Sequence, residues 1–339
     1  DLHRRRHSFP TRRSSDLLVG ELNQYFQMEG GRDPQIDLSD VIFVDRPGMG
    51  SEGGLISMDG VYPLSVLAWN DTEKGDTELR DFSEAGVIEV GPIRAARLDG
   101  PSLVMPRRKS YDKYGLIMQS IPQMARWGKH LWLRLVARAL MLGVGNGLAY
   151  DGVAYFSASH LVNQLDGGGD VYSNVLTNTE LDEGGIAAGM DLLGTTLDLN
   201  GSSPANAGMM LPCVMVPTFR LYLKALHLFG FPGAMIAQAV GAGAAAGVST
   251  VLAGKAKVVY NPYLYTEATN KTTAAKTWFL ISDAGRKPLI VREEEQPIIT
   301  MTTDADFPRH QRDAKLAYVE AYCAVGYGEP RSIVRITTP

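Results

Sequence analysis

The longest uninterrupted helical pattern in the chain is SIPQMARWGKHLWLRLVARALMLG, residues 120–143. Apolar residues recur in it at intervals of three and four, the spacing of one face of an α-helix. Ser120 is the predicted N-cap, Pro122 lies in the first turn where its missing N–H costs nothing, and Gly143 is the predicted left-handed C-cap. At about 1.5 Å per residue, the helix would be a rod roughly 36 Å long.

The opposite face of this helix is basic. It carries Arg126, His130, Arg134 and Arg138 at intervals of four residues, with Lys129 beside them. A face of this kind is most often simply solvated, so the charge alone assigns no partner.

Strands are predicted on both sides of the helix. Before it, residues 41–45 form one strand, and 87–90 and 93–98 form two short runs that favour a projecting hairpin around Gly91-Pro92. After it, Thr179 is expected to open a second helix and residues 218–230 a third. The remaining predicted strands are residues 209–217, 257–264, 277–282, 288–293, 297–301, 316–325 and 332–337.

Two further segments are interpreted from composition. The run Glu293 to Glu295 is expected to be a solvated strand end, or to face arginines of a neighbouring copy. The segment GAGAAAG, residues 241–247, does not fit a phosphate-binding loop and predicts a flexible surface loop.

The bulk composition describes a large globular chain without an obvious ligand. Of its 339 residues, 45% are hydrophobic and 21% charged, with a net charge of -4. That is enough apolar material for one large domain or two intergrown ones, and no apolar run reaches the ~18 residues of a membrane span. Cys213 and Cys323 show no metal-ligand spacing, so we expect no metal or cofactor, and a reducing cytosol is the expected compartment.

The first 17 residues, DLHRRRHSFPTRRSSDL, differ from the rest of the chain, with five arginines and two aspartates. A disordered basic arm and a nucleic-acid-binding tail are two interpretations. The interpretation we prefer is that HSFPTRRSSDL is a translated sequencing adapter, because the Asp-Leu at positions 1–2 repeats the ending at positions 16–17.

One pair of residues invites a catalytic interpretation. In the segment YFSASH, Ser157 and Ser159 precede His160, which is the combination of a nucleophile and a base. The G-x-S-x-G elbow of serine hydrolases is absent, and no second His or Cys lies at ligand spacing from His160. A hydrolase using Ser157 and His160 is therefore kept only as the weakest alternative, and the chain is predicted not to be an enzyme.

The order of these segments resembles the major head subunit of Mu-like phages, the gpT family. The resemblance covers residues 87–338 and rests on the co-linear series of the long helix, YFSASH, TELDEGGIAAGMDLL, LPCVMVPTFRLYLKAL, AGKAKVVYNPYL, TWFLISDAGRKPLIV and a final long strand. It implies an α+β chain with the Hong Kong 97-type capsid fold. In that fold a peripheral domain is built on a long spine helix and a long β-hairpin, and an axial domain faces the capsomer centre.

The resemblance also implies a division of the chain. Residues 120–143 would be the spine helix, and 241–247 would lie near the capsomer axis. The implied regions are 1–17 as the artefact, 18–59 as an N-terminal arm, 60–109 as an extended loop, 110–203 as the peripheral domain, 204–280 as the axial domain and 281–339 as peripheral-domain strands.

The implied function is a structural major capsid protein. It would assemble with copies of itself into an icosahedral shell around phage or prophage DNA, with scaffold and portal proteins as partners and no membrane. Assembly would take place in the bacterial host cytoplasm, and the product would be the virion capsid. Arg126, Arg134 and Arg138 would then contact packaged double-stranded DNA or acids of a neighbouring subunit, with a solvated face as the alternative. A shell enclosing cargo enzymes, as in encapsulins, is the second interpretation.

Overall fold

The structure is a computed structural model. It describes residues 38–45, 56–58, 88–90, 96–106, 116–143, 145, 147–162, 169–198, 204–210, 212–229, 254–284, 287–301 and 314–339. The interpretations made for residues 1–17, the loop at 241–247 and most of the extended loop at 60–109 therefore lie outside the described residues.

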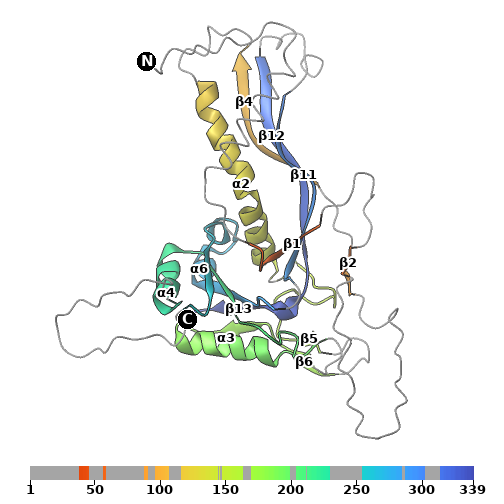
Figure 1. Cartoon of the computed structure of the whole chain (residues 1–339), viewed down its shortest axis with the longest axis vertical. Coiled ribbons are helices and arrows are strands. Elements are labelled where there is room, and N and C mark those ends of the chain that lie inside the picture. Colours follow the sequence, from red (N-terminus) through yellow and green to blue (C-terminus); the bar gives the residue numbers. More distant parts are fainter. Residues whose placement is uncertain are drawn as a thin grey trace, which may run out of the picture.

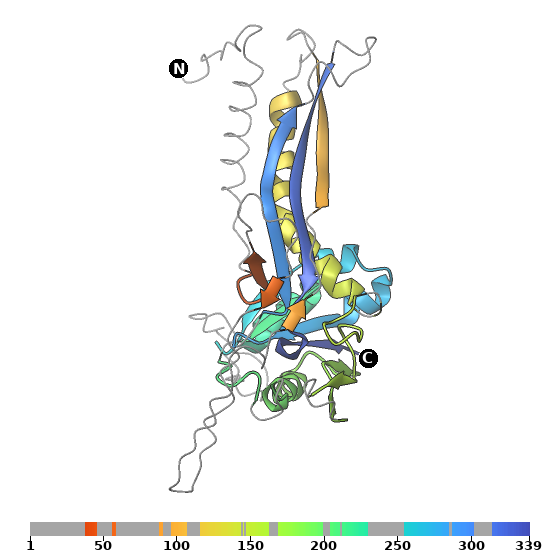
Figure 2. The ribbon, with the colours of Figure 1, turned by 90° about the vertical axis from the view of Figure 1, so that its right-hand side faces the viewer.

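A long helix laid along long strands forms one end of the molecule, as Figures 1 and 2 show. Helix α2 (Leu116–Leu142) packs on a four-stranded sheet whose order is β1-β11-β12-β4. Its strands are β1 (Ile42–Asp45), β11 (Leu289–Met301), β12 (Ala314–Tyr327) and β4 (Ala96–Pro106). We call α2 with β4, β11 and β12 the arm. Because β11 and β12 are antiparallel and span 13 and 14 residues, they form a hairpin comparable in length to the helix.

The long helix begins earlier than predicted. Ser120 is its fifth residue, so Ser120 is not the N-cap and Pro122 lies inside the helix. Residues 116–119, LIMQ, are good helix formers, which is why the proline did not mark the start. Gly143 is not among the glycines with positive φ in the described part of the chain, so the predicted left-handed C-cap is wrong. A Cβ on Gly143 would lie 3.1 Å from the ring of Phe156, so close packing is what its small size serves.

A five-stranded sheet forms the centre of the other end, which we call the body. Its order is β7-β13-β10-β8-β9, with parallel pairing at both outer positions and antiparallel pairing between β13, β10 and β8. The bounds are β7 (Val175–Thr177), β13 (Ile333–Thr337), β10 (Thr277–Ile281), β8 (Cys213–Val216) and β9 (Lys257–Tyr260).

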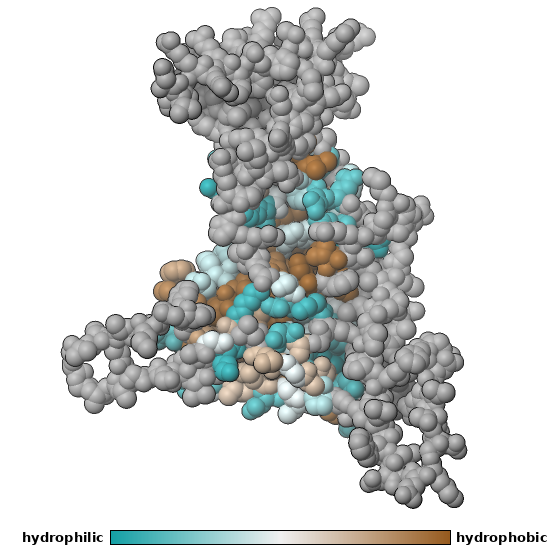
Figure 3. All heavy atoms as spheres, in the orientation of Figure 1, coloured by the Kyte–Doolittle hydropathy of each residue, from teal (hydrophilic) through white to brown (hydrophobic). Residues whose placement is uncertain are grey.

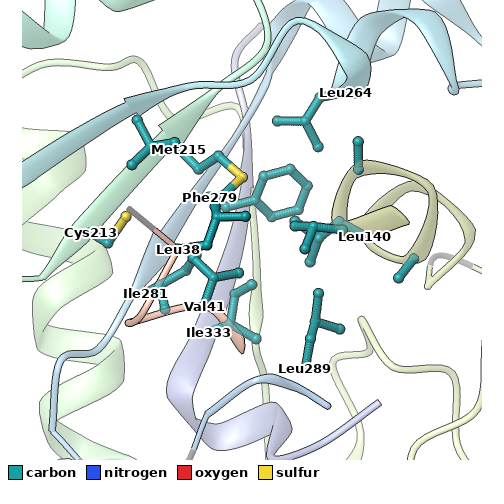
Figure 4. Close-up of a cluster of buried hydrophobic side chains, with 14 of the residues drawn as sticks. Leu38, Val41, Leu140, Cys213, Met215, Leu264, Phe279, Ile281, Leu289 and Ile333 are labelled. Carbon is teal, nitrogen blue, oxygen red and sulfur yellow. The ribbon is translucent and has the colours of Figure 1, made fainter. Parts of the chain in front are cut away.

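Alternate residues of this sheet serve two cores. On one face, Met215, Phe279 and Ile333 pack against the C-terminal half of α2, including Leu140 (Figure 4). On the other face, the intervening residues of the same strands pack under helices α3 (Glu183–Thr195) and α4 (Phe219–Phe229). The sheet is thus covered on both faces, which explains why all residues of β8 and β10 are buried.

The predicted strands at 288–293 and 297–301 are one strand, β11. The ladder with β12 shifts register between Glu293 and Glu295 and again between Glu295 and Ile298. These irregularities accommodate Pro297, which has no N–H for a regular ladder. The expectation of a solvated strand end is wrong for Glu293, which is only 5% exposed, whereas Glu295 is exposed.

Two local predictions are wrong. Strand β3 (Ile88–Val90) pairs with β2 (Ile56–Met58), and β4 pairs with β12, so residues 87–98 do not form a hairpin of their own. Helix α3 is capped by Asp182, whose Oδ1 accepts the Gly185 N–H at 2.7 Å, so Thr179 does not open it.

The remaining elements are short. They are β5 (His160–Leu161), β6 (Val171–Tyr172), α5 (Tyr263–Thr266), α6 (Lys271–Lys276) and the 3-10 turn η3 (Pro330–Ser332). Strands β7 and β13, from the ranges expected for the peripheral domain, share a sheet with β8, β9 and β10, from the range expected for the axial domain. The division by sequence range stays a prediction.

The predicted fold class is confirmed. The chain is α+β, and its long helix lies along a long β-hairpin beside a second sheet, which is the arrangement expected of the Hong Kong 97-type fold.

Candidate assembly surfaces

The basic face of α2 divides into parts with different surroundings. A step of four residues advances about 40° around a helix, so residues spaced by four drift away from one another. His130 and Arg134 turn toward α5: His130 Nδ1 lies 3.1 Å from the Tyr263 hydroxyl, and Arg134 Nε donates to Glu267 Oε1 at 2.6 Å. The middle of the face thus binds the body of its own chain.

Arg126 and Arg138 lie at the two ends of this face, and both are exposed. Twelve positions apart, they are separated by about 120° around the axis and roughly 18 Å along it. The structure therefore does not gather Arg126, Arg134 and Arg138 into one cluster. They are separate basic points along the arm, and Arg134 pairs with Glu267 of its own chain.

The dyad that a hydrolase would require is not formed. His160 is fully buried, with Nδ1 2.6 Å from Asp151 Oδ2 and Nε2 3.1 Å from the Tyr155 carbonyl oxygen. Both partners are oxygen atoms that accept hydrogen bonds. The Ser157 hydroxyl lies instead 3.0 Å from that of Ser159. His160 is therefore a buried structural residue without access to Ser157.

His160 belongs to a cluster that the sequence did not reveal, which we call the polar node: Asp151, His160, Tyr172, Glu329 and Arg331. Arg331 is 2% exposed, pairs with Glu329 at 3.1 Å, and lies over the Tyr172 ring. Tyr172 in turn stacks on His160. The guanidinium also donates to three backbone carbonyl oxygens, those of Leu161, Val162 and Leu197.

The polar node favours the ionised form of Asp151 and the neutral form of Tyr172. Burial opposes ionisation of Asp151, but hydrogen bonds from His160 and from the Val153 N–H outweigh it, and the pKa of Asp151 is lowered. Burial raises the pKa of Tyr172 well above its ordinary value, so its phenol stays neutral between the side chains of His160 and Arg331. The node fixes loops from four parts of the chain. Its members come from positions as far apart as 151 and 331, so no local spacing could have predicted it.

Exposed apolar side chains are the second feature of the described surface. Met210 is 78% exposed, Leu148 59%, Phe219 57% and Leu223 52%. Only Phe219 and Leu223 of these lie four residues apart on one helix, α4, and so share a face. Figure 3 shows brown, apolar surface beside teal surface at the left of the body, where Figure 1 places α4.

Neither metal-binding nor membrane-spanning features are found in the part of the chain that the structure describes. Within it, no three His, Cys, Asp or Glu side chains are grouped to hold a metal ion. Its helices include none that is long and apolar enough to cross a membrane. Cys213 and Cys323 are buried and form no disulfide with each other.

No known protein family and no curated protein matches this sequence. Solved structures do resemble the fold. The capsid structure of the cyanophage P-SCSP1u matches with a TM-score of 0.49 and 9% identity, over 88% of this chain and 86% of that one. The procapsid of bacteriophage JBD30 matches with a TM-score of 0.46 and 16% identity, over 97% and 77%.

A virus-like particle from Pyrococcus furiosus also matches, with a TM-score of 0.46 and 9% identity, over 94% of this chain and 99% of that one. Identities of 16% or less and TM-scores below 0.5 are too low to carry a function from these proteins to this chain. A function is therefore assigned from the geometry of the chain itself.

Proposed function

We propose that the chain is a major capsid protein, a building unit of the shell that encloses phage or prophage DNA. The observation that carries this proposal is the arm, in which a 27-residue helix lies along strands of 11, 13 and 14 residues that extend away from the body. The order of segments resembles the Mu-like phage head subunit, the family to which we assign the chain within this proposal.

The shape suits a protein that works by contact with copies of itself. A shell forms from many modest interfaces per subunit, which together are strong although each is weak enough to be corrected during assembly. An elongated arm offers more contact area per residue than a compact globule does. We infer that scaffold and portal proteins are partners during assembly in the host cytoplasm, and that the finished subunit resides in the virion capsid.

The basic points of the arm are the proposed sites of contact with packaged DNA or with a neighbouring subunit. Arg126 and Arg138 are exposed, and Arg134 retains about half of its side-chain exposure beside Glu267. Separate cations along a rod suit phosphate contacts, which need charge but no shared pocket.

Expression of the chain with and without residues 1–17, followed by electron microscopy and nuclease treatment, tests the proposal. We expect closed particles containing nuclease-protected DNA when the packaging partners are present. Particles that enclose protein in place of nucleic acid would favour the encapsulin-like cargo shell. Single subunits that never form particles under either condition would contradict both.

The role of the arginines is tested by replacing Arg126, Arg134 and Arg138 together with glutamine. A role in DNA contact predicts a normal yield of empty shells and a reduced yield of filled ones, whereas a role between subunits predicts fewer shells of both kinds. The matched control is Arg134→Gln alone, which breaks the Glu267 pair within the chain and leaves Arg126 and Arg138 in place. Unchanged yields of empty and filled shells would mean that these arginines only form a solvated face of the helix.

A further inference from the structure

The outer face of α4 combines large apolar side chains with positive charge. Phe219 and Leu223 are 57% and 52% exposed, although each is a residue that usually lies in a core. Exposed beside them on the same helix are Arg220, Lys224 and His227. The opposite side of the helix, with Ala225 and Phe229, is buried in the body. The exposed residues of the outer face are therefore not the residues by which α4 packs on its own chain.

The aromatic part of this face is held in place. The Phe219 ring lies 5.9 Å from that of Tyr222 and 6.1 Å from that of Tyr260, and the two tyrosine rings are 5.7 Å apart. Tyr260 belongs to β9, the edge strand of the five-stranded sheet. An aromatic residue fixed by its neighbours loses little conformational entropy on binding, which is typical of interface anchors.

A face of complementary character lies on α3. The exposed residues there are small or acidic: Gly184, Ala187 and Ala188, with Glu183 and Asp191. Helix α3 packs over β13 and β10, and α4 packs over β8 and β9, so the two helices cover different halves of one sheet face. One end of this layer is therefore bulky and basic, and the other is small and acidic.

We propose that the outer face of α4 docks on the outer face of α3 of a second copy of this chain. Phe219 and Leu223 project from α4, whereas the apolar part of the α3 face consists of glycine and alanine. The two large side chains of one copy therefore fit against the small residues of the other. Arg220 approaches carboxylates, and opposite charges meet only when α4 faces α3, since either face against its own kind would bring like charges together. Two different patches meet, so repetition of the contact can close a ring.

An ion pair of the same kind exists within one copy. Lys224 Nζ of α4 lies 2.9 Å from Oε2 of Glu180, a residue just before α3. That ion pair is exposed on both sides and contributes little by itself. It leaves Arg220, Glu183 and Asp191 for the neighbouring copy. This inference rests on the proposed function, because a shell supplies the second copy.

The apolar part of the contact is tested with Phe219→Ser/Leu223→Ser. We expect the concentration needed for assembly to rise about tenfold or more, because two anchors are lost. Met210→Ser is the matched control: it removes a side chain that is more exposed, 78%, but lies outside α4, and assembly should not change. An equal effect of both variants would overturn the proposal.

Charge reversal tests the choice of α3 as the partner. Arg220→Glu alone and Glu183→Lys/Asp191→Lys alone should each reduce assembly, and the chain carrying all three changes should recover it. Loss in the single sets without recovery in the combination would overturn α3 as the docking face.

A cross-linking experiment separates failure of this contact from failure of the proposed function. Leu223→Cys chains are mixed with Ala187→Cys chains under mild oxidation, while the native thiols are buried. Disulfide dimers should form in the mixture and not in either chain alone, whether or not shells form. Shells from the unaltered chain without any such dimers would overturn the contact and leave the function standing.

Discussion

The arm and the body bury their apolar residues in different ways. In the body, one sheet supplies two cores, because residues alternate between the α2 face and the α3/α4 face. In the upper part of the arm, the described core is a small cluster in which Leu131 packs with Ala321 and Cys323. The sheet of the body is thus packed on both faces, with α2 of the arm completing one of its two cores, whereas the core described in the upper part of the arm is small.

The largest expected effect compares one leucine from each region. Leu280→Ala in the body should cost about 4–5 kcal/mol, because its surroundings are packed on all sides and cannot collapse. Leu131→Ala in the arm should cost about 2–3 kcal/mol, because its cluster is small and can relax. Chemical denaturation of unassembled chains measures both. Equal losses would remove the distinction between arm and body.

Breaking the polar node is the next largest effect. Asp151→Asn should cost about 3–5 kcal/mol at neutral pH, since it leaves the buried His160 ring without its charged partner. The folded-state pKa of Asp151 is lowered, so its contribution is fully present above the ordinary value of 3.8 and is lost as the pH falls below that value. Stability curves against pH should therefore converge in strong acid. A constant gap between the two proteins would contradict the assigned ion pair.

Two glycines on α3 test how tightly the body is packed at the buried and the exposed side of this helix. A Cβ on Gly189 would lie 2.9 Å from Leu280 and 3.1 Å from Ile336, so Gly189→Ala should cost about 1–3 kcal/mol. Gly194 has nothing within 4 Å of the same position, so Gly194→Ala should stabilise the helix by about 0.5–1 kcal/mol. Thermal unfolding compares the two. Gly189→Ala should cost less in the Leu280→Ala background, where space has been opened.

The smallest effect concerns the junction of the two regions. The Arg134–Glu267 ion pair joins α2 to the segment after α5, with Arg134 51% and Glu267 19% exposed. A double-mutant cycle with Arg134→Gln and Glu267→Gln should give a coupling of about 0.2–1 kcal/mol that decreases with salt. A coupling above that range would mean that the arm is fixed to the body more firmly than this exposed pair allows.

The sequence predicted elements more successfully than it predicted partners. Helix α4 and strands β1, β8, β10, β12 and β13 follow from local periodicity, and each lies within about two residues of its predicted range apart from the flanks of β8. The hairpin at 87–98 failed because β4 pairs with residues more than 200 positions away. Local pattern carries no information on which strands become neighbours.

The candidate sites show the same limit. Arg126, Arg134 and Arg138 could be placed on one helix from spacing alone, but the salt bridge to Glu267 depends on a contact 133 positions distant. His160 was noticed, yet beside the wrong partners, because adjacent serines are visible in the sequence and a buried Asp151 is not. The exposure of Phe219 and Leu223 likewise depends on what else covers α4, which only the fold determines.

Sedimentation velocity on the purified chain, at a series of concentrations, tests the central claim most directly. If the chain is a shell subunit, mass should pass cooperatively from single chains to megadalton particles above a threshold concentration, with few intermediates. A chain that sediments as one copy at every concentration, with or without residues 1–17, would contradict the claim.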